Sequence, residues 1–203
     1  MWREASATST VVVCALGLAS IVSLRADVRA SKREAALLKQ KVATINDRAA
    51  KPSNVARRIT VTESEVNSYL VYEARDQIPV GVVDPSITVI GPGRLSARAV
   101  VDLDAVRKQK APTSLLDPMN YLMGRLAVTA VGTLKTANGV GRIELESSSV
   151  GSIPVPKILL QEIVGYYSRT PARPAGISLD DPFQLPARIR EIKVERGQAI
   201  VVQ

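Results

Sequence analysis

Two stretches of the chain, 86–103 and 125–150, contain short runs in which apolar and polar residues alternate. A β-strand points successive side chains to opposite faces, so each run predicts a strand with one apolar and one polar face. The turn residues Gly91-Pro92-Gly93 and Asn138-Gly139 lie inside these stretches. Glycine and asparagine tolerate the positive φ of tight turns, and the pattern therefore predicts two antiparallel hairpins.

Apolar residues at helical spacing predict further elements. Thr62-Glu63-Ser64-Glu65 is a capping box, which opens a helix that Ile78-Pro79 and Asp84-Pro85 end. The stretches 25–50 and 154–168 also have helical periodicity. A shorter helix, interrupted by Pro118, is expected over 115–122.

β-branched residues at 58–61 predict a first strand, and the residues from 190 to 202 predict a closing hairpin. The order of elements is then strand, helix, two hairpins, helix and hairpin. This order indicates an α+β domain over 58–203, in which a curved antiparallel meander of about six strands packs on one or two helices. An N-terminal membrane helix and a helical stalk are expected to precede it.

The segment from Ala5 to Leu24 has no charged residue, and its 20 residues are about enough to span a bilayer core. Residues 1–24 are therefore interpreted as a signal anchor, with a cleaved signal peptide as the alternative. Leu24-Arg25-Ala26 is a poor cleavage site because a large residue stands where a small one is needed.

Residues 25–57 form a basic helical stalk and linker in this interpretation. Residues 1–58 contain 11 Lys/Arg and 4 Asp/Glu, whereas residues 59–203 contain 16 and 15. Because the basic charge precedes the domain, a nucleic-acid partner is not expected, and anionic lipid headgroups are the better partner for this charge. Few apolar positions recur along the helix, which favours a solvated spacer over a coiled coil or a helix on the lipid surface.

The membrane orientation involves two opposing signals. The positive charges that follow the apolar segment favour a domain in the cytoplasm, whereas an apolar segment so close to the N-terminus is typical of an export signal. We expect an inner-membrane protein with its domain on the periplasmic side; secretion after signal cleavage is the alternative.

Candidate catalytic chemistry is sparse. The chain has no histidine, and its single cysteine, Cys14, lies in the apolar segment. Most metal sites and the Ser-His and Cys-His nucleophiles are thereby excluded. Glu144 and Glu146 alternate along one strand, and Asp180-Asp181 precedes a proline, but these carboxylates are interpreted as surface and turn residues. No catalytic residue, metal ligand or cofactor is expected.

The helix start Thr60-Val61-Thr62-Glu63-Ser64-Glu65-Val66-Asn67-Ser68-Tyr69-Leu70, followed by hairpins, resembles small exported bacterial lipid-binding or lipoprotein-like domains of the tubular lipid-binding (TULIP-type) fold. The segments 181–186 and 197–202 are similar to those of secreted bacterial proteins. The resemblance covers roughly residues 58–203, and it implies a curved sheet that wraps a helix and leaves an apolar groove.

The leading hypothesis is a non-enzymatic, membrane-anchored envelope protein whose α+β domain binds a lipid or another apolar ligand. The alternative is a scaffold domain that binds other envelope proteins without a ligand. An aliphatic-lined cavity would favour the first, and an apolar patch on a filled core would favour the second. The candidate ligand-binding residues are Leu95, Val101, Val128, Leu145, Leu159, Leu160, Ile163, Val164 and Tyr167.

Overall fold

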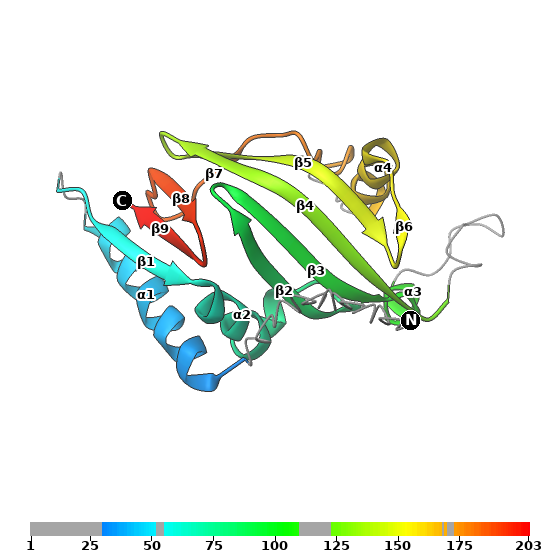
Figure 1. Ribbon diagram of the computed structural model, residues 1–203, viewed down its shortest axis with the longest axis horizontal. Coiled ribbons are helices and arrows are strands. Elements are labelled where there is room, and N and C mark those ends of the chain that lie inside the picture. Colours follow the sequence, from blue (N-terminus) through cyan, green and yellow to red (C-terminus); the bar gives the residue numbers. More distant parts are fainter. Residues whose placement is uncertain (1–29, 52–54, 110–122, 168, 170–172) are drawn as a thin grey trace, which may run out of the picture.

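A computed structural model describes residues 30–51, 55–109, 123–167, 169 and 173–203. The described part of the chain has α+β architecture, as predicted, with two antiparallel sheets and four α-helices (Figure 1). The predicted membrane segment 1–24 and the predicted helix 115–122 lie outside the described residues. Within the described residues, no helix is long and apolar enough to cross a membrane.

The terminal strands form a small sheet of their own, where a single meander was predicted. Its strand order is β1-β9-β8, and Ile200 of the central strand lies opposite both Thr60 and Lys193. The sequence pattern could not show this separation, because β1 finds its partner only at the far end of the chain. The strands are β1 (Arg58–Thr62), β8 (Glu191–Glu195) and β9 (Gln198–Val202).

Helix α1 (Lys32–Ala50) confirms the predicted helix, but it is not a solvated spacer. The Ser31 hydroxyl accepts a hydrogen bond from the Arg33 N–H and caps the helix. Leu38 and Ile45 are buried against the small sheet, and so α1 forms part of the core. The buried members of this core are Leu38, Ile45, Val61, Leu185, Ile189 and Val201.

The predicted capping box opens α2 (Glu63–Tyr72). The Thr62 hydroxyl accepts from the Glu65 N–H, and the Glu65 carboxylate accepts from the Thr62 N–H. A short 3₁₀ turn, η1 (Arg75–Gln77), follows the helix and leads to the first strand of the larger sheet.

The larger sheet contains both predicted hairpins. Its strand order is β2-β3-β4-β5-β6, with β7 paired to β5, and the sheet remains open. Asn138 and Gly139 both have positive φ at the turn between β4 and β5, as the sequence indicated. The strands are β2 (Val82–Gly91), β3 (Arg94–Asp102), β4 (Arg125–Ala137), β5 (Val140–Val150), β6 (Ile153–Pro154) and β7 (Phe183–Gln184).

One face of this larger sheet, here called the apolar face, is aliphatic across four strands. Residues that are paired across antiparallel strands point to the same face, so the register identifies its members. The residues are Val82, Ile87, Val89, Leu95, Ala97, Ala99, Val101, Leu126, Val128, Ala130, Leu134, Ile143, Leu145 and Val150.

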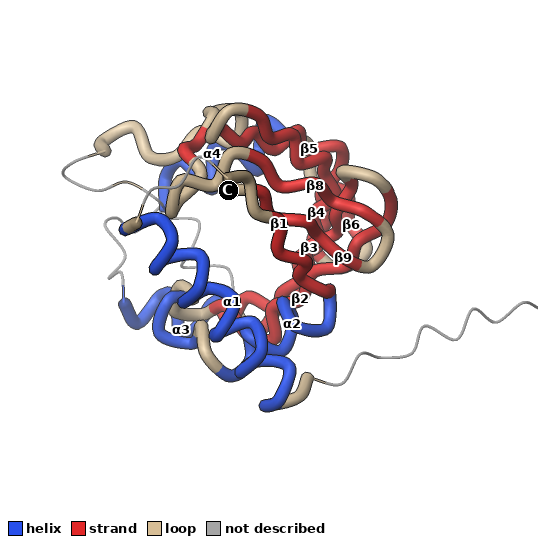
Figure 2. The backbone as a smooth tube through the Cα atoms, turned by 90° about the vertical axis from the view of Figure 1, so that its left-hand side faces the viewer, coloured by secondary structure: helices blue, strands red, loops and turns tan. Residues whose placement is uncertain are grey.

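The strands curve around the side on which two further helices lie, α3 (Leu103–Gln109) and α4 (Lys157–Tyr167) (Figure 2). Ser148 lies opposite Ala130 and thus belongs to the apolar side of the sheet. Its hydroxyl donates to the Val155 carbonyl, and the Val155 N–H donates to the Ser148 carbonyl, both at 2.8 Å. Because α4 begins two residues later, the apolar face is the inner face of the curve.

Candidate functional site

The structure places the four predicted strand residues on one surface. Leu95, Val101, Val128 and Leu145 all belong to the apolar face. Leu95 and Leu145 both lie opposite Gly132, Val101 lies opposite Leu126, and Val128 lies opposite Ala99. Each of the four is only partly buried. The alternation along the strands therefore identified residues that share a face, although their role in binding stays a prediction.

The predicted residues of α4 differ in how exposed their side chains are. Leu160 and Val164 are partly buried, whereas Leu159 is 50% exposed. The side chains of Ile163 and Tyr167 lie outside the described residues. Helix α4 reaches the sheet at β5, on the inner side of the curve, and so lies along one border of the apolar face.

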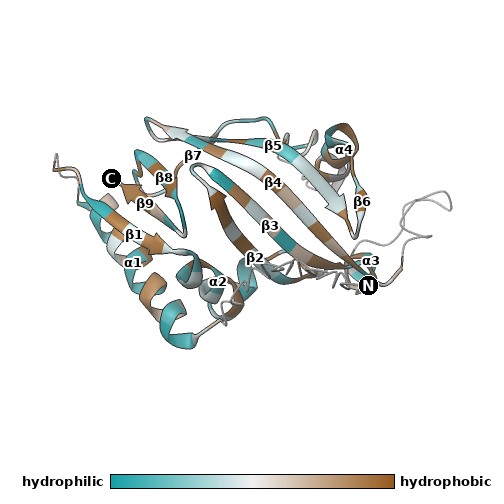
Figure 3. Cartoon of the chain, viewed as in Figure 1, coloured by the Kyte–Doolittle hydropathy of each residue, from teal (hydrophilic) through white to brown (hydrophobic). Residues whose placement is uncertain are grey.

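The apolar face differs from the small core in how well it is covered. None of its members is among the buried hydrophobic residues, and Ala97 and Ile143 are exposed. Ala97 lies at the centre of the face, opposite Ile87 on one side and Ala130 on the other. Figure 3 shows apolar residues recurring along β2, β3 and β4. The face is therefore an accessible aliphatic surface bordered by helices.

The opposite, outer face of the sheet carries paired charges. Arg94 donates hydrogen bonds to both carboxylate oxygens of Glu146, the shortest at 2.6 Å, and Lys135 pairs with Glu144 at 2.7 Å. The hydrogen bond from Arg94, with a second from Thr133, holds the pKa of Glu146 below its ordinary value. The two glutamates that alternate along β5 are thus engaged in surface ion pairs.

Another carboxylate is held at the end of the sheet. The Ala105 N–H and the Arg125 guanidinium both donate to Asp102, and these hydrogen bonds lower its pKa. Asp180 pairs with Lys157 of α4. Among the described residues, no group of three or more carboxylate or thiol side chains is placed to hold a metal ion.

The motif that carried the family resemblance has a structural role. The carboxylate of Glu65 is buried and accepts from Lys41 of α1, and Ser68 accepts from the Ser31 N–H at the start of α1. Asn67 exchanges two hydrogen bonds of 2.8 Å with the backbone of Ile87, while Glu63 accepts from the Val89 N–H. One turn of α2 therefore connects α1, β1 and the edge of the larger sheet.

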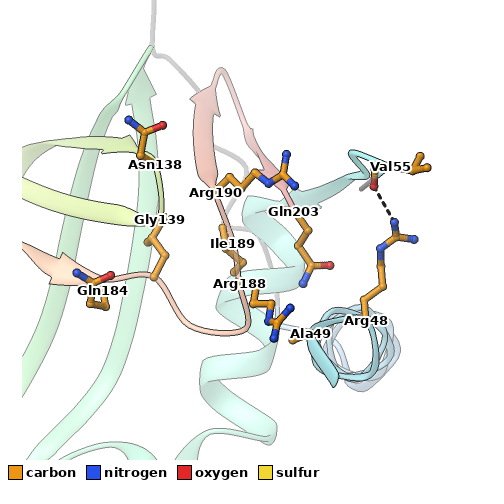
Figure 4. A pocket seen from close by; sticks show the side chains of 11 residues that line it. Arg48, Ala49, Val55, Asn138, Gly139, Gln184, Arg188, Ile189, Arg190 and Gln203 are labelled. Atoms are coloured by element: carbon orange, nitrogen blue, oxygen red, sulfur yellow. Dashed lines mark hydrogen bonds between the residues drawn. The ribbon is translucent and has the colours of Figure 1, made fainter. Parts of the chain in front are cut away.

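A pocket of about 420 Å³ lies at the junction of the two sheets, and the sequence did not predict it (Figure 4). Its walls come from the end of α1, the turn between β4 and β5, and the segment before β8. None of the nine predicted ligand-binding residues lines it. The lining residues are Arg48, Ala49, Val55, Asn138, Gly139, Gln184, Leu185, Arg188, Ile189, Arg190 and Gln203.

These segments are far apart in the sequence, and only the tertiary fold brings them together. The one local signal is the alternation of Arg188 and Arg190 around Ile189, which places Ile189 in the core and leaves both arginines exposed. Comparisons with protein-family models, with curated proteins and with solved structures gave no match. The resemblance to the tubular lipid-binding fold stays a prediction.

Proposed function

We propose that this protein is a non-catalytic lipid-binding protein of the cell envelope, which holds an acyl chain against the apolar face of its larger sheet. The observation that supports this proposal is the accessible centre of that face. Ala97 is exposed there, and the large aliphatic residues around it are only partly buried. A ligand that covered them would gain roughly 25 cal/mol for each Å² of apolar surface removed from water.

The chemistry of the face fits an acyl chain better than a ring system. Its members on β2 to β5 are Val, Ile, Leu and Ala. Phe183 of β7, opposite Gly141, adds one aromatic ring at the border, so the face is mainly aliphatic rather than a stacking platform for sugars or bases. The face runs along β3 and β4, which are 9 and 13 residues long, and so offers an extended track rather than a compact hole. Anchorage by residues 1–24, and a position outside the inner membrane, remain part of the proposal.

Native mass spectrometry of the full-length protein, in a volatile buffer with a non-ionic detergent, tests this function. We expect wild-type protein to retain a lipid-sized adduct. Ala97→Glu places a carboxylate in the middle of the apolar face and should lower occupancy about tenfold or more, because burying a charge against an acyl chain is unfavourable. Since Ala97 is exposed, the variant is expected to fold.

Ser96→Glu is the matched control, because it adds the same side chain to the adjacent residue on the outer face. Ser96→Glu should keep the adduct. A wild-type protein without an adduct, or equal occupancy in the two variants, would refute lipid binding on this face.

The scaffold alternative rests on a different surface. Ile153 and Ile158, near the start of α4, are 70% and 75% exposed, and Leu159 of the same helix is 50% exposed. Where exposed aliphatic residues gather, they are typical of a contact between proteins. Ile158→Ser should leave the lipid adduct unchanged. If it instead abolishes co-purification of a stoichiometric protein partner while Ala97→Glu does not, the scaffold function is favoured.

A further inference from the structure

The pocket between the two sheets gathers three arginines from two distant parts of the chain. Arg48 belongs to the last turn of α1, whereas Arg188 and Arg190 belong to the segment that enters β8. Figure 4 shows Arg48 reaching from α1 toward Val55, while Arg188 and Arg190 extend from the segment before β8, with Gln203 between that segment and Arg48. All three arginines line the same recess.

Within the described part of the chain, the positive charge of this recess has no carboxylate counterpart. No aspartate or glutamate is among the lining residues, and no ion pair is formed by Arg48, Arg188 or Arg190. Arg48 donates one hydrogen bond, to the Val55 carbonyl at 3.0 Å. Glu191, the nearest acidic residue in sequence to Arg190, pairs with Lys193.

Three arginines elsewhere in the described chain, Arg94, Arg107 and Arg125, each lie within hydrogen-bond distance of a carboxylate. Arg98 and Arg142 of the larger sheet form no ion pair with a described residue, but they do not line this pocket. Like charges brought together without a counterion repel one another, so the pocket is a place where a bound anion would relieve that repulsion. What sets this recess apart is that three arginines line one pocket whose lining residues include no carboxylate.

The backbone that carries two of the arginines is held in an unusual conformation. Ala187 and Arg188 both have positive φ, 52° and 55°, although neither is glycine. The side-chain amide of Gln203 donates to the Ala187 carbonyl at 2.7 Å and to the Ile45 carbonyl at 2.9 Å, which fixes this turn to the end of α1. Positive φ is unfavourable for residues other than glycine. Such a conformation persists only where contacts with the surrounding structure hold the backbone in place.

We propose that this pocket binds a phosphate group through Arg48, Arg188 and Arg190. The planar guanidinium matches two phosphate oxygens at once, which makes arginine the preferred side chain for this anion. A volume of about 420 Å³ falls within the range of small-molecule sites, roughly 300–1,000 Å³, and accommodates a phosphate with an attached group. The same chemistry recognises a free phosphorylated compound or a phospholipid headgroup.

Isothermal titration of the detergent-solubilised full-length protein tests the site, with inorganic phosphate, pyrophosphate and dihexanoyl phosphatidic acid as probes. Wild-type protein should bind at least one probe, with an affinity that falls as the salt concentration rises. The double variant R188Q/R190Q should weaken that binding at least tenfold. R188K/R190K keeps the charge but loses the bidentate geometry, and it should bind with intermediate affinity.

Arg98→Gln is the control, since Arg98 is an exposed arginine on the outer face of the larger sheet. It should bind all probes like wild type, and circular dichroism establishes that each variant is folded. Phosphatidic acid binding at least tenfold tighter than the phosphates would identify a lipid headgroup, and comparable affinities would identify a free phosphorylated compound. No binding by wild type, or equal loss in R98Q and R188Q/R190Q, would overturn the proposal. The result is independent of Ala97→Glu, which lies on another surface.

Discussion

Asn67 offers a quantitative test of how α2 is joined to the larger sheet. Its side-chain amide donates to the Ile87 carbonyl and accepts from the Ile87 N–H, both at 2.8 Å. β2 is the edge strand, so at this position the asparagine takes the place that a neighbouring strand would occupy. Replacing Asn67 with alanine removes both hydrogen bonds and leaves two backbone groups without their partner.

The size of the effect follows from these contacts. An intramolecular hydrogen bond contributes about 1 kcal/mol net, and a partly buried group left unpaired adds to the cost, giving about 2–3 kcal/mol for the two bonds. Alanine is a better helix former than asparagine, and this difference stabilises the folded variant by about 0.5 kcal/mol. We therefore expect Asn67→Ala to lower the free energy of unfolding by about 2 kcal/mol.

Urea unfolding of the full-length protein measures this difference, and hydrogen exchange of the Ile87 amide locates it. Asn46→Ala is the matched control, because Asn46 is exposed on α1 and should gain only the helix-propensity term of about 0.5 kcal/mol. If Asn67→Ala unfolds at the wild-type urea midpoint and the Ile87 amide keeps its protection, the reasoning is wrong.

Three further predictions concern other parts of the molecule. Leu38→Ala should lower the free energy of unfolding by about 2–5 kcal/mol, because Leu38 is buried in the core. Leu37→Ala, at a residue that is 37% exposed, should lower it by less than about 1 kcal/mol, and similar urea midpoints for the two variants would restore the spacer interpretation of α1. The hydrogen bond from Arg94 lowers the pKa of Glu146, so the ion pair stabilises the fold above the ordinary pKa of 4.5, and this stabilisation is lost as the pH falls through the pKa of the folded state. The difference in unfolding free energy between wild type and Glu146→Gln should therefore narrow in acid. A difference that widens there would contradict this assignment. Gly141→Ala would place a methyl group 2.6 Å from the Phe183 ring, and proteolysis of the 173–190 segment should become faster as β7 is displaced; an unchanged rate would show that the ring moves without cost.

The local elements were predictable because short-range patterns determine them. Alternation identified both hairpins, and the motif at Thr62 identified the cap of α2. The partners of α1 were not predictable, because its apolar residues meet Leu185 and Val201, which are distant in sequence. A stripe of few apolar residues on a helix fits a solvated spacer equally well until those partners are known.

The same distinction applies to the candidate sites. The strand residues of the apolar face follow from period-two alternation, and the register confirms that they share a face. The arginine pocket depends on how α1 meets the segment before β8, and no pattern within either segment specifies that contact. The acidic and polar residues around Glu65 looked like a family signature, and their contacts give them a structural purpose.

The pairing of β1 with β9 also determines the order in which the protein can fold. Thr60 lies opposite Ile200, so the two strands that pair are separated in the sequence by all the strands of the larger sheet. Hairpins form early because their contacts are local, whereas closing so long a loop is slow. During synthesis, α1 meets α2 and Val61 of β1 early, but Leu38 and Ile45 lack Leu185 and Val201 until the C-terminal segment has been made. Apolar surface exposed in that interval favours aggregation.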